Sequence, residues 1–417
     1  MTQHRRRWLI GALVVIAAVL HALLLADNWR LASSEEHGRD FASFYYASKV
    51  ASAGQDPYNG SQLSKAASTE GARTRVYPYF YPPPFLALMS WCKGLSLTGA
   101  YRLWFWVDEL FAWLCALILI RWWAPLGPSR WLFLLLPMLS ATTFTNNHLM
   151  GQVNLMALTL TLGGLAAQSK GRPWLGGLAV GTACMIKMSP ALFVLYWLVQ
   201  RRYKAVAGSL VAAVLLSLLS LTIVSFETQL RFYSDILPGL FSGDYNGLRI
   251  PISIFGNHSP SEFFHSLLPG ARTQLSTAGR LLSVSTTLGC LLLLFRSCSK
   301  RPQSALHEAA QVSAVALTML LIPLYTYEHH MVWAWPAIAL LCYAAWQRII
   351  DRRWLWLAAA LWLVWATQLM SLKLVYVWIK PISGLLGWCI KEAKFLALVS
   401  LFIAMLRLER VFRRRSC

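Results

Sequence analysis

The sequence predicts an all-α, polytopic membrane protein. Of its 417 residues, 57% are hydrophobic and only 13% are charged, and the mean hydropathy is +0.49, which is far from the balance of a soluble globular domain. Apolar blocks of roughly 15 to 22 residues recur along the chain and match the ~20 residues that a helix needs to cross a bilayer. No segments of about ten alternating residues indicate a β-barrel, and open sheets cannot span a membrane because their edge groups would stay unsatisfied.

About twelve spans are expected, and basic residues cluster where they end. The first span, residues 8–26, is a retained anchor because it is too long for a signal-peptide core. The last, 382–406, is the weakest because Lys391, Glu392 and Lys394 interrupt it. The positive-inside rule places the basic turns and both termini in the cytoplasm, so the net charge of +21 reflects topology and not nucleic-acid binding. The other predicted spans are 103–122, 131–144, 153–167, 174–188, 190–199, 205–225, 281–294, 312–324, 331–346 and 354–369.

Two long connections carry most of the unusual polar residues. The first extracytoplasmic loop, residues 27–82, is expected to hold short interfacial helices, one of them over 40–53, which a glycine and a proline end. The second large extracytoplasmic loop covers residues 226–280. No internal repeat divides the chain. We therefore expect one membrane domain over 1–417, with a basic cytoplasmic tail over 407–417.

Asp40 is the first candidate for chemistry. It begins the helix expected over 40–53, and the predicted topology places it just outside the membrane, where an acid has no packing role. A carboxylate there can accept a proton from a hydroxyl group, as general bases do. The structural alternative is an exposed loop acid. Asp56, in the same loop, is a second acid that can share or replace this role.

Further polar residues are predicted on the same side of the membrane. Lys187 lies in an apolar run, where a lysine is costly and faces either a ligand or an ion-pair partner such as Asp108 or Glu109. Gln152 and Asn154 lie in an amide-rich corner. These amides either cap two helices or form hydrogen bonds with sugar hydroxyls.

The turn before a late span holds a secondary acid candidate, Glu328, followed by His329 and His330. A carboxylate beside two histidines can hold a phosphate or a metal, although adjacent histidines on a helix point in different directions. The alternative is a solvated turn. Arg249 and His258 in the second long loop suit an anionic or hydroxyl-rich ligand. No nucleotide-binding loop or zinc motif occurs, so no metal ligands are predicted and divalent metal dependence stays open.

Six short motifs occur in order along nearly the whole chain. They are Asp40-Phe41 with Tyr45-Tyr46-Ala47, Gly54-x-x-Pro57-Tyr58, Tyr81-Pro82-Pro83, Gly151-Gln152-x-Asn154, Lys187-x-Ser189-Pro190, and His329-His330 with Pro336. In this order they resemble the GT-C glycosyltransferases, and specifically glycosyltransferase family 87. That family includes polyprenyl-phosphate-mannose-dependent mannosyltransferases.

The resemblance implies a GT-C fold and a reaction that inverts the anomeric carbon. Asp40 would deprotonate the acceptor hydroxyl while the sugar leaves its polyprenyl phosphate, and His329 and His330 would face the donor phosphate. Lys187 and Arg249 are then plausible phosphate contacts. The same reading adds two further candidates for contact with the donor phosphate or the substrate, Tyr45 and His258.

The expected function is transfer of a hexose, with mannose favoured, to a lipid or glycan acceptor at the outer face of a bacterial inner membrane. Nucleotides are not available on that face, so an activated donor must arrive through the membrane as a lipid-linked phosphate. The expected partners are the bilayer, the polyprenyl-phosphate sugar and the acceptor, with no nucleic acid and no resident cofactor. A transporter or flippase of lipid-linked sugars is the first alternative, and a scaffold subunit without catalysis is the second.

Overall fold

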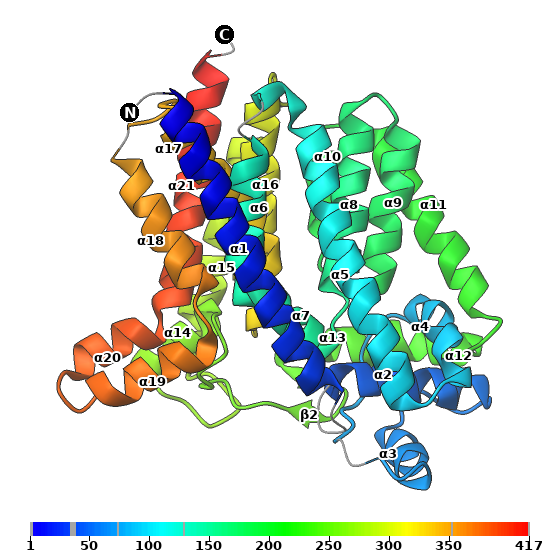
Figure 1. Cartoon of the computed structure of the whole chain (residues 1–417). Helices are drawn as coiled ribbons and strands as arrows, with labels where there is room; N and C mark the ends of the chain where they lie inside the picture. The colour runs from blue at the N-terminus through cyan, green and yellow to red at the C-terminus, as the bar shows by residue number, and fades with distance from the viewer. Residues whose placement is uncertain (1–2, 34–38, 73–74, 128–129, 352, 416–417) are drawn as a thin grey trace. The chain divides into compact units, whose positions relative to one another are not determined.

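The computed structural model describes residues 3–33, 39–72, 75–127, 130–351 and 353–415 (Figure 1). Parts of the expected 27–82 loop and of the 407–417 tail therefore lie outside the described residues. The chain forms two compact units. The first unit comprises Met1–Ala26, Ala116–Asn146 and Ile252–Cys417, and the second comprises Asp27–Cys115 and Asn147–Pro251.

The second unit combines long apolar helices with a group of short elements near one end of them (Figure 1). Helices α8, α9 and α11 pack side by side. The short elements come from both predicted long loops, and they include a two-stranded antiparallel hairpin. The elements are α2 Arg39–Ser52, α3 Gly60–Thr69, α4 Pro83–Met89, η1 Ser90–Gly94, most of α5 Leu97–Trp122, α8 Asn154–Ser169, α9 Pro173–Ile186, α10 Ala191–Val199, α11 Tyr203–Ser220, α12 Phe226–Arg231, η3 Phe232–Ile236, α13 Leu237–Ser242, β1 Asp244–Tyr245 and β2 Leu248–Arg249.

The first unit is built around two largely buried helices, α16 and α17. Helix α21 packs against α16, and α18 packs against α17. Helices α19 and α20 form a hairpin at the end of this unit opposite the chain termini (Figure 1). The elements are most of α1 Gln3–Ala32, the end of α5, η2 Ala124–Leu126, α6 Arg130–Ser140, the first part of α7 Thr142–Met150, whose last residues belong to the second unit, α14 Pro260–Leu267, α15 Thr277–Cys298, α16 Ala305–Leu321, η4 Glu328–Ala334, α17 Trp335–Trp346, α18 Trp354–Ala366, α19 Leu369–Ile379, α20 Gly384–Lys391 and α21 Ala393–Arg415.

The length and apolarity of the helices identify a multi-pass membrane protein. Among the described residues, four helices are long and apolar enough to cross a membrane, and six spans result if each of two bent helix pairs counts as one. Several other predicted spans fall on shorter helices, so the number of about twelve stays a prediction. The expected span over 382–406 is not one helix. It breaks at Glu392 into α20 and α21, at the charged residues that weaken it in the sequence.

The expected helix over 40–53 is confirmed by α2. This helix ends just before Gly54, which has a φ of 71°. A second short helix, α3, is present in the rest of the first long loop. The interfacial position of both helices stays a prediction. The proline-rich segment before Pro83 is irregular. Helix α4 begins with prolines in its first turn, where the backbone N–H groups have no partner within the helix, so their absence costs no hydrogen bond.

Candidate functional site

Asp40 lies in the first turn of α2 and is partly exposed. Its Oδ2 accepts a hydrogen bond of 2.7 Å from Nε2 of Gln152. The other end of the same amide, Oε1, accepts a hydrogen bond of 3.1 Å from the Tyr81 hydroxyl. Gln152 therefore bridges a hydroxyl and a carboxylate from two other segments. We call Asp40, Gln152, Tyr81, Lys187 and Asn154 the Asp40 cluster.

A sharp corner between α7 and α8 brings Gln152 to α2. The two helices are bent by 118°, and Gly151 at the corner has a φ of 65°, which favours glycine. A Cβ on Gly151 would lie 2.5 Å from Cβ of Phe41. Any larger residue would therefore push the corner away from α2 and separate Gln152 from Asp40.

Tyr81 is held by its aromatic and backbone neighbours. Its ring packs edge-on against Phe44, with the centroids 4.8 Å apart, and its carbonyl accepts a hydrogen bond of 2.8 Å from the Tyr58 hydroxyl. Burial raises the pKa of Tyr81, and the nearby negative charge of Asp40 raises it further. The hydroxyl therefore stays protonated and donates to Gln152.

Lys187 follows the last residue of α9 in extended backbone conformation. Its Nζ donates a hydrogen bond of 2.7 Å to Oδ1 of Asn154 and lies 6.0 Å from the centroid of the Tyr81 ring. The Asp40 carboxylate is close enough to act on the Lys187 ammonium electrostatically. The amine of Lys187 and the carboxylate of Asp40 thus interact within the Asp40 cluster.

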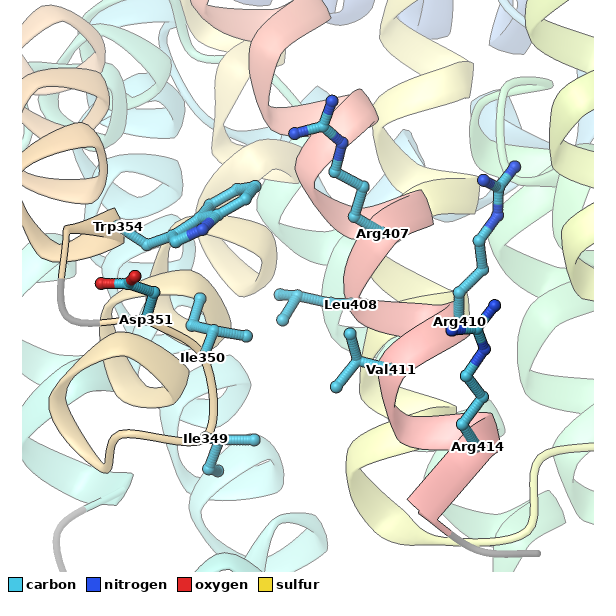
Figure 2. Close-up of a pocket in the computed structure, with 9 residues that line it drawn as sticks. All are labelled: Ile349, Ile350, Asp351, Trp354, Arg407, Leu408, Arg410, Val411 and Arg414. Carbon is cyan, nitrogen blue, oxygen red and sulfur yellow. The ribbon is translucent and has the colours of Figure 1, made fainter.

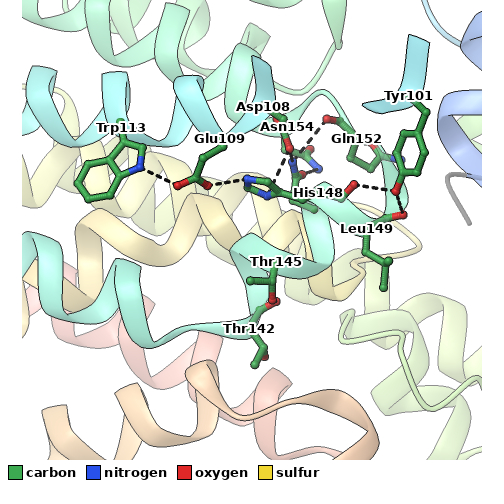
Figure 3. A network of polar contacts seen from close by, with 11 residues as sticks. Tyr101, Asp108, Glu109, Trp113, Thr142, Thr145, His148, Leu149, Gln152 and Asn154 are labelled. Atoms are coloured by element: carbon green, nitrogen blue, oxygen red, sulfur yellow. Dashed lines mark hydrogen bonds and ion pairs between the residues drawn. The ribbon is translucent and has the colours of Figure 1, made fainter. Parts of the chain in front are cut away.

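Two acids inside α5 connect to the amide-rich corner. Asn154 donates to Asn147, at 2.9 Å, and Asn147 donates to Oδ2 of Asp108, at 2.6 Å. Lys187 therefore reaches Asp108 through two amides, and the sequence alternative of a direct pair is replaced by this relay. Figure 3 shows Asn154 and Asp108 within this network. Gln152 and Asn154 are thus bonded to side chains, and α8 begins without a side-chain cap.

The second acid of α5 belongs to a separate branch of the network. Oε2 of Glu109 lies 2.8 Å from Nε2 of His148, and its Oε1 accepts a hydrogen bond of 2.6 Å from the Trp113 indole (Figure 3). His148 is fully buried and also lies 3.5 Å from Asp108. These contacts hold α5 against the corner and account for both intramembrane acids.

Two candidates from the first loop have partners away from the Asp40 cluster. Asp56 forms an ion pair with Arg231, which joins the first loop to the second. The Tyr45 hydroxyl donates a hydrogen bond of 2.7 Å to the Leu95 carbonyl, and the Lys49 ammonium lies over its ring. Both side chains are thus engaged in packing the loops of the second unit.

Arg249 lies on the exposed hairpin of the second loop. It pairs across the strands with Asp244, at 3.5 Å. At the hairpin turn, the Asn246 side chain donates to the carbonyls of Tyr58 and Tyr79, at 2.6 and 2.9 Å. The hairpin therefore fastens onto the first loop, and Arg249 has a structural role in keeping its strands together.

The first unit holds a different acid, Glu328, which is 3% exposed. Its Oε1 accepts a hydrogen bond from the Lys394 ammonium, and its Oε2 lies 3.3 Å from Nε2 of His258. Lys394 also donates to the carbonyls of Trp365 and Thr367. Burial alone would raise the pKa of Glu328, but Lys394 and His258 together hold it below its usual range. We call Glu328, Lys394 and His258 the Glu328 cluster.

His329 and His330 follow directly in η4. Their rings are nearly perpendicular, with centroids 4.5 Å apart, so the two imidazoles face different directions, as expected. Nδ1 of His330 accepts a hydrogen bond of 3.2 Å from the Tyr327 backbone N–H. Within the described part of the chain, no group of three or more His, Cys, Asp or Glu side chains is arranged to hold a metal ion.

Sequence reasoning did not assign two of these residues to a site. Tyr81 occurs in one of the quoted motifs, but the motif gave it no role. Asn147 belongs to the amide-rich corner that the sequence singles out. Lys394 was visible only as an interruption of an apolar run, although a lysine there signals a buried partner.

Comparison with known proteins gives a family match and several relatives. The sequence profile of Glycosyltransferase family 87 matches residues 79–323, which is more than half of the chain. A polyprenol-phosphate-mannose-dependent α-(1-2)-phosphatidylinositol mannoside mannosyltransferase of Mycobacterium tuberculosis is 24% identical over 49% of this chain and 44% of its own. The corresponding pentamannoside mannosyltransferase of Mycolicibacterium smegmatis is 30% identical over 51% of this chain and 48% of its own.

A third relative carries a different sugar in its name. An α-(1->3)-arabinofuranosyltransferase of Mycobacterium tuberculosis is 27% identical over 52% of this chain and 48% of its own. The matches thus span less than half the length of these relatives. Among solved structures, ArnT from Cupriavidus metallidurans bound to undecaprenyl phosphate is 15% identical, with a TM-score of 0.47, over 95% of this chain and 77% of its own.

Proposed function

Because the chain belongs to glycosyltransferase family 87, we propose that it transfers a hexose from a polyprenyl-phosphate donor to a hydroxyl group of a lipid or glycan acceptor. Mannose is the proposed sugar, since two relatives have polyprenol-phosphate-mannose in their names. Arabinofuranose is the competing choice, because a third relative is named for that sugar.

The observation that carries the proposal is the partly exposed Asp40 carboxylate, oriented by Gln152. We assign Asp40 the role of general base. The acceptor hydroxyl gives its proton to this carboxylate while the hydroxyl oxygen attacks the anomeric carbon of the donor sugar. The bond from that carbon to the phosphate oxygen breaks, and its electron pair leaves with the polyprenyl phosphate. Attack opposite the leaving group inverts the anomeric carbon, and the proton transfer is worth about 10²–10⁴-fold in rate.

Lys187 is assigned to electrostatic support of this step. A donor that departs as a phosphate develops negative charge, which a nearby ammonium stabilises. Because Asn154 fixes its Nζ, Lys187 is already placed before substrate binds. Gln152 and Tyr81 keep the carboxylate of Asp40 in one orientation, so they are positioning residues.

The histidines are proposed as contacts to the donor phosphate. His329 and His330 are the primary candidates, because two imidazoles side by side offer ring N–H donors for phosphate oxygens. His258 is buried against Glu328, and Arg249 is paired with Asp244. The proposal therefore does not depend on His258 or Arg249.

The proposed setting is a GT-C fold of about twelve spans in a bacterial inner membrane. Both termini would be cytoplasmic, and Asp40 would face the outside. The basic turns at the ends of the apolar blocks support this orientation. An outward-facing site explains a lipid-linked donor, because that donor is delivered within the membrane.

A reconstitution assay tests the proposal. The purified full chain in liposomes is supplied with labelled polyprenyl-phosphate mannose, polyprenyl-phosphate arabinofuranose or a nucleotide-linked mannose, together with a bacterial membrane lipid extract as acceptor. Label should pass from polyprenyl-phosphate mannose to the extract and not from the nucleotide sugar. Movement of the lipid-linked sugar across the bilayer without transfer would instead support a flippase, and transfer from the nucleotide sugar would contradict the proposal.

A further inference from the structure

The first unit has a basic pocket formed by none of the residues assigned to transfer. It lies between the C-terminal part of α21 and the connection from α17 to α18, and its volume is ≈ 420 Å³ (Figure 2). Its lining combines three guanidinium groups and the carboxylate of Asp351 with aliphatic and aromatic side chains. The residues that matter for its chemistry are Arg407, Arg410, Arg414, Trp354, Val411 and Ile350.

Three arginines share one face of α21. Arg407, Arg410 and Arg414 are spaced three and four residues apart, which places them on neighbouring turns of one helix face. Within the described residues, no carboxylate pairs with these three, whereas Arg413 lies 3.8 Å from Glu409. The Arg407 guanidinium lies 5.8 Å from the centroid of the Trp354 ring. Asp351 also lines the pocket but forms no ion pair with these arginines in the described chain, so three guanidinium groups and one carboxylate leave the lining net positive.

Aliphatic side chains form the inner wall of the pocket. Leu408 and Val411 point from α21 toward Ile349 and Ile350 of the connecting segment (Figure 2). Polar groups of a ligand would meet the arginines, and hydrocarbon would meet this wall. Such a combination favours an amphiphile over a small soluble anion.

The position of the pocket along α21 agrees with the depth of a lipid headgroup. The helix has 23 residues and is about 34 Å long by the usual rise per residue. Its residues 395–406 are uncharged, and the arginines follow directly after them. The predicted topology places this end in the cytoplasm. The arginines then lie where the phosphates of the cytoplasmic leaflet lie.

Membrane topology and the helix dipole explain why α21 ends in basic residues, but they do not explain the shape of the pocket. Basic residues collect on the cytoplasmic side, and cations near a helix C-terminus are stabilised by the helix dipole. Neither effect requires a walled pocket with an aliphatic side. We propose that this pocket binds an anionic phospholipid of the cytoplasmic leaflet, with its phosphate on the arginines and the beginning of an acyl chain on the aliphatic wall.

Lipid binding to the full chain tests this proposal. Native mass spectrometry of the detergent-solubilised protein measures the affinities for dioleoylphosphatidylglycerol and for dioleoylphosphatidylcholine. The anionic lipid should bind at least tenfold more tightly. The variants R407Q, R410Q and R414Q should each weaken its binding about fivefold, the change expected for about 1 kcal/mol per basic residue. The triple variant should lose the preference for the anionic lipid.

The control removes the same charge elsewhere. The variant R201Q/R202Q/K204Q, in the turn before α11, should change the affinity less than threefold. An equal loss in this control, or equal binding of the two lipids by the wild-type chain, would overturn the proposal. Competition by glycerol 3-phosphate at the concentrations where the lipid binds would also overturn it, in favour of a soluble anion. If the triple variant does not fold, the three single variants decide the question.

Discussion

Two acids of this protein, Asp40 and Glu328, occupy opposite kinds of surroundings. Asp40 is partly exposed and is oriented by the neutral amide of Gln152. Glu328 is 3% exposed and receives a hydrogen bond from the Lys394 ammonium. A carboxylate that a substrate can reach and that a neutral donor orients is suited to proton transfer. A carboxylate that is buried and paired with a cation instead joins elements of the fold. Removing either partner would leave the other as an unpaired buried charge.

Removing the charge of Asp40 tests this difference between the two acids most directly. Asp40→Asn keeps the shape of the side chain but cannot accept a proton, so turnover should fall by about 10²–10⁴-fold. Turnover in proteoliposomes and the unfolding temperature are measured on the same preparation. Asp56→Asn is the matched control, because its partly exposed pair with Arg231 should contribute about 1 kcal/mol of stability. The reverse pattern would assign the base to Asp56.

The second test concerns the buried pair. Glu328→Gln leaves the Lys394 ammonium without its anion, so the free energy of unfolding should fall by about 3–5 kcal/mol. Thermal unfolding in detergent measures the change. The double variant Glu328→Met with Lys394→Leu removes both charges and should lose less stability than the single variant. A single variant as stable as the wild type would show that the pair does not hold the fold.

The same pair predicts a dependence on pH. The pKa of Glu328 is lower in the folded chain than in the unfolded chain, so its stabilising contribution is present above the unfolded value of about 4.3. That contribution is lost as the pH falls through the lower folded value. Below about pH 5, the pH passes first the unfolded value of about 4.3 and then the lower folded value. Over this range the wild-type chain should lose more stability than Glu328→Gln. Parallel losses in the two proteins would contradict this assignment.

The next prediction concerns Gln152, the neutral amide that orients Asp40. Gln152→Ala removes a hydrogen bond to a charged group, worth about 1.5–3 kcal/mol, so turnover should fall by roughly 10- to 100-fold. Initial rates at saturating donor test this expectation. Gln168→Ala, near the other end of α8, is the control and should change turnover less than threefold. A Gln152 variant with wild-type turnover would remove the amide from the positioning of Asp40.

The smallest expected effect belongs to the Tyr81 hydroxyl. Tyr81→Phe removes one neutral hydrogen bond to Gln152, which is worth about 0.5–1.5 kcal/mol, and turnover should fall roughly 2- to 10-fold. Tyr79→Phe removes a comparable buried hydrogen bond, to the Pro82 carbonyl, and should change stability without changing turnover. Equal effects on turnover would show that both hydroxyls act through packing alone.

Much of the fold was predictable because membrane helices are encoded in local composition. The apolar blocks and the helix beginning at Asp40 are local patterns, and the structure contains the expected α2. The break of 382–406 at Glu392 falls at the charged residues that weaken this span in the sequence, but the partner of Lys394 is Glu328, more than sixty residues away. A long-range ion pair of this kind cannot be read from the local sequence.

The candidate site divides in the same way. Asp40, Lys187 and Gln152 stand out in the sequence because polar residues beside apolar blocks are costly. Their connections depend on the α7–α8 corner and on the close approach that Gly151 permits. Asp56, Tyr45 and Arg249 are equally conspicuous in the sequence, and the structure gives each of them a partner outside the Asp40 cluster that the local sequence does not indicate.

The dependence of the Asp40→Asn defect on acceptor acidity tests the central claim, that Asp40 is the base, most directly. Acceptor analogues with fluorine beside the reacting hydroxyl have a lower hydroxyl pKa and therefore need less help from a base. The ratio of wild-type to Asp40→Asn turnover should fall as the hydroxyl pKa falls. A ratio that stays constant across the analogues would contradict general-base catalysis by Asp40.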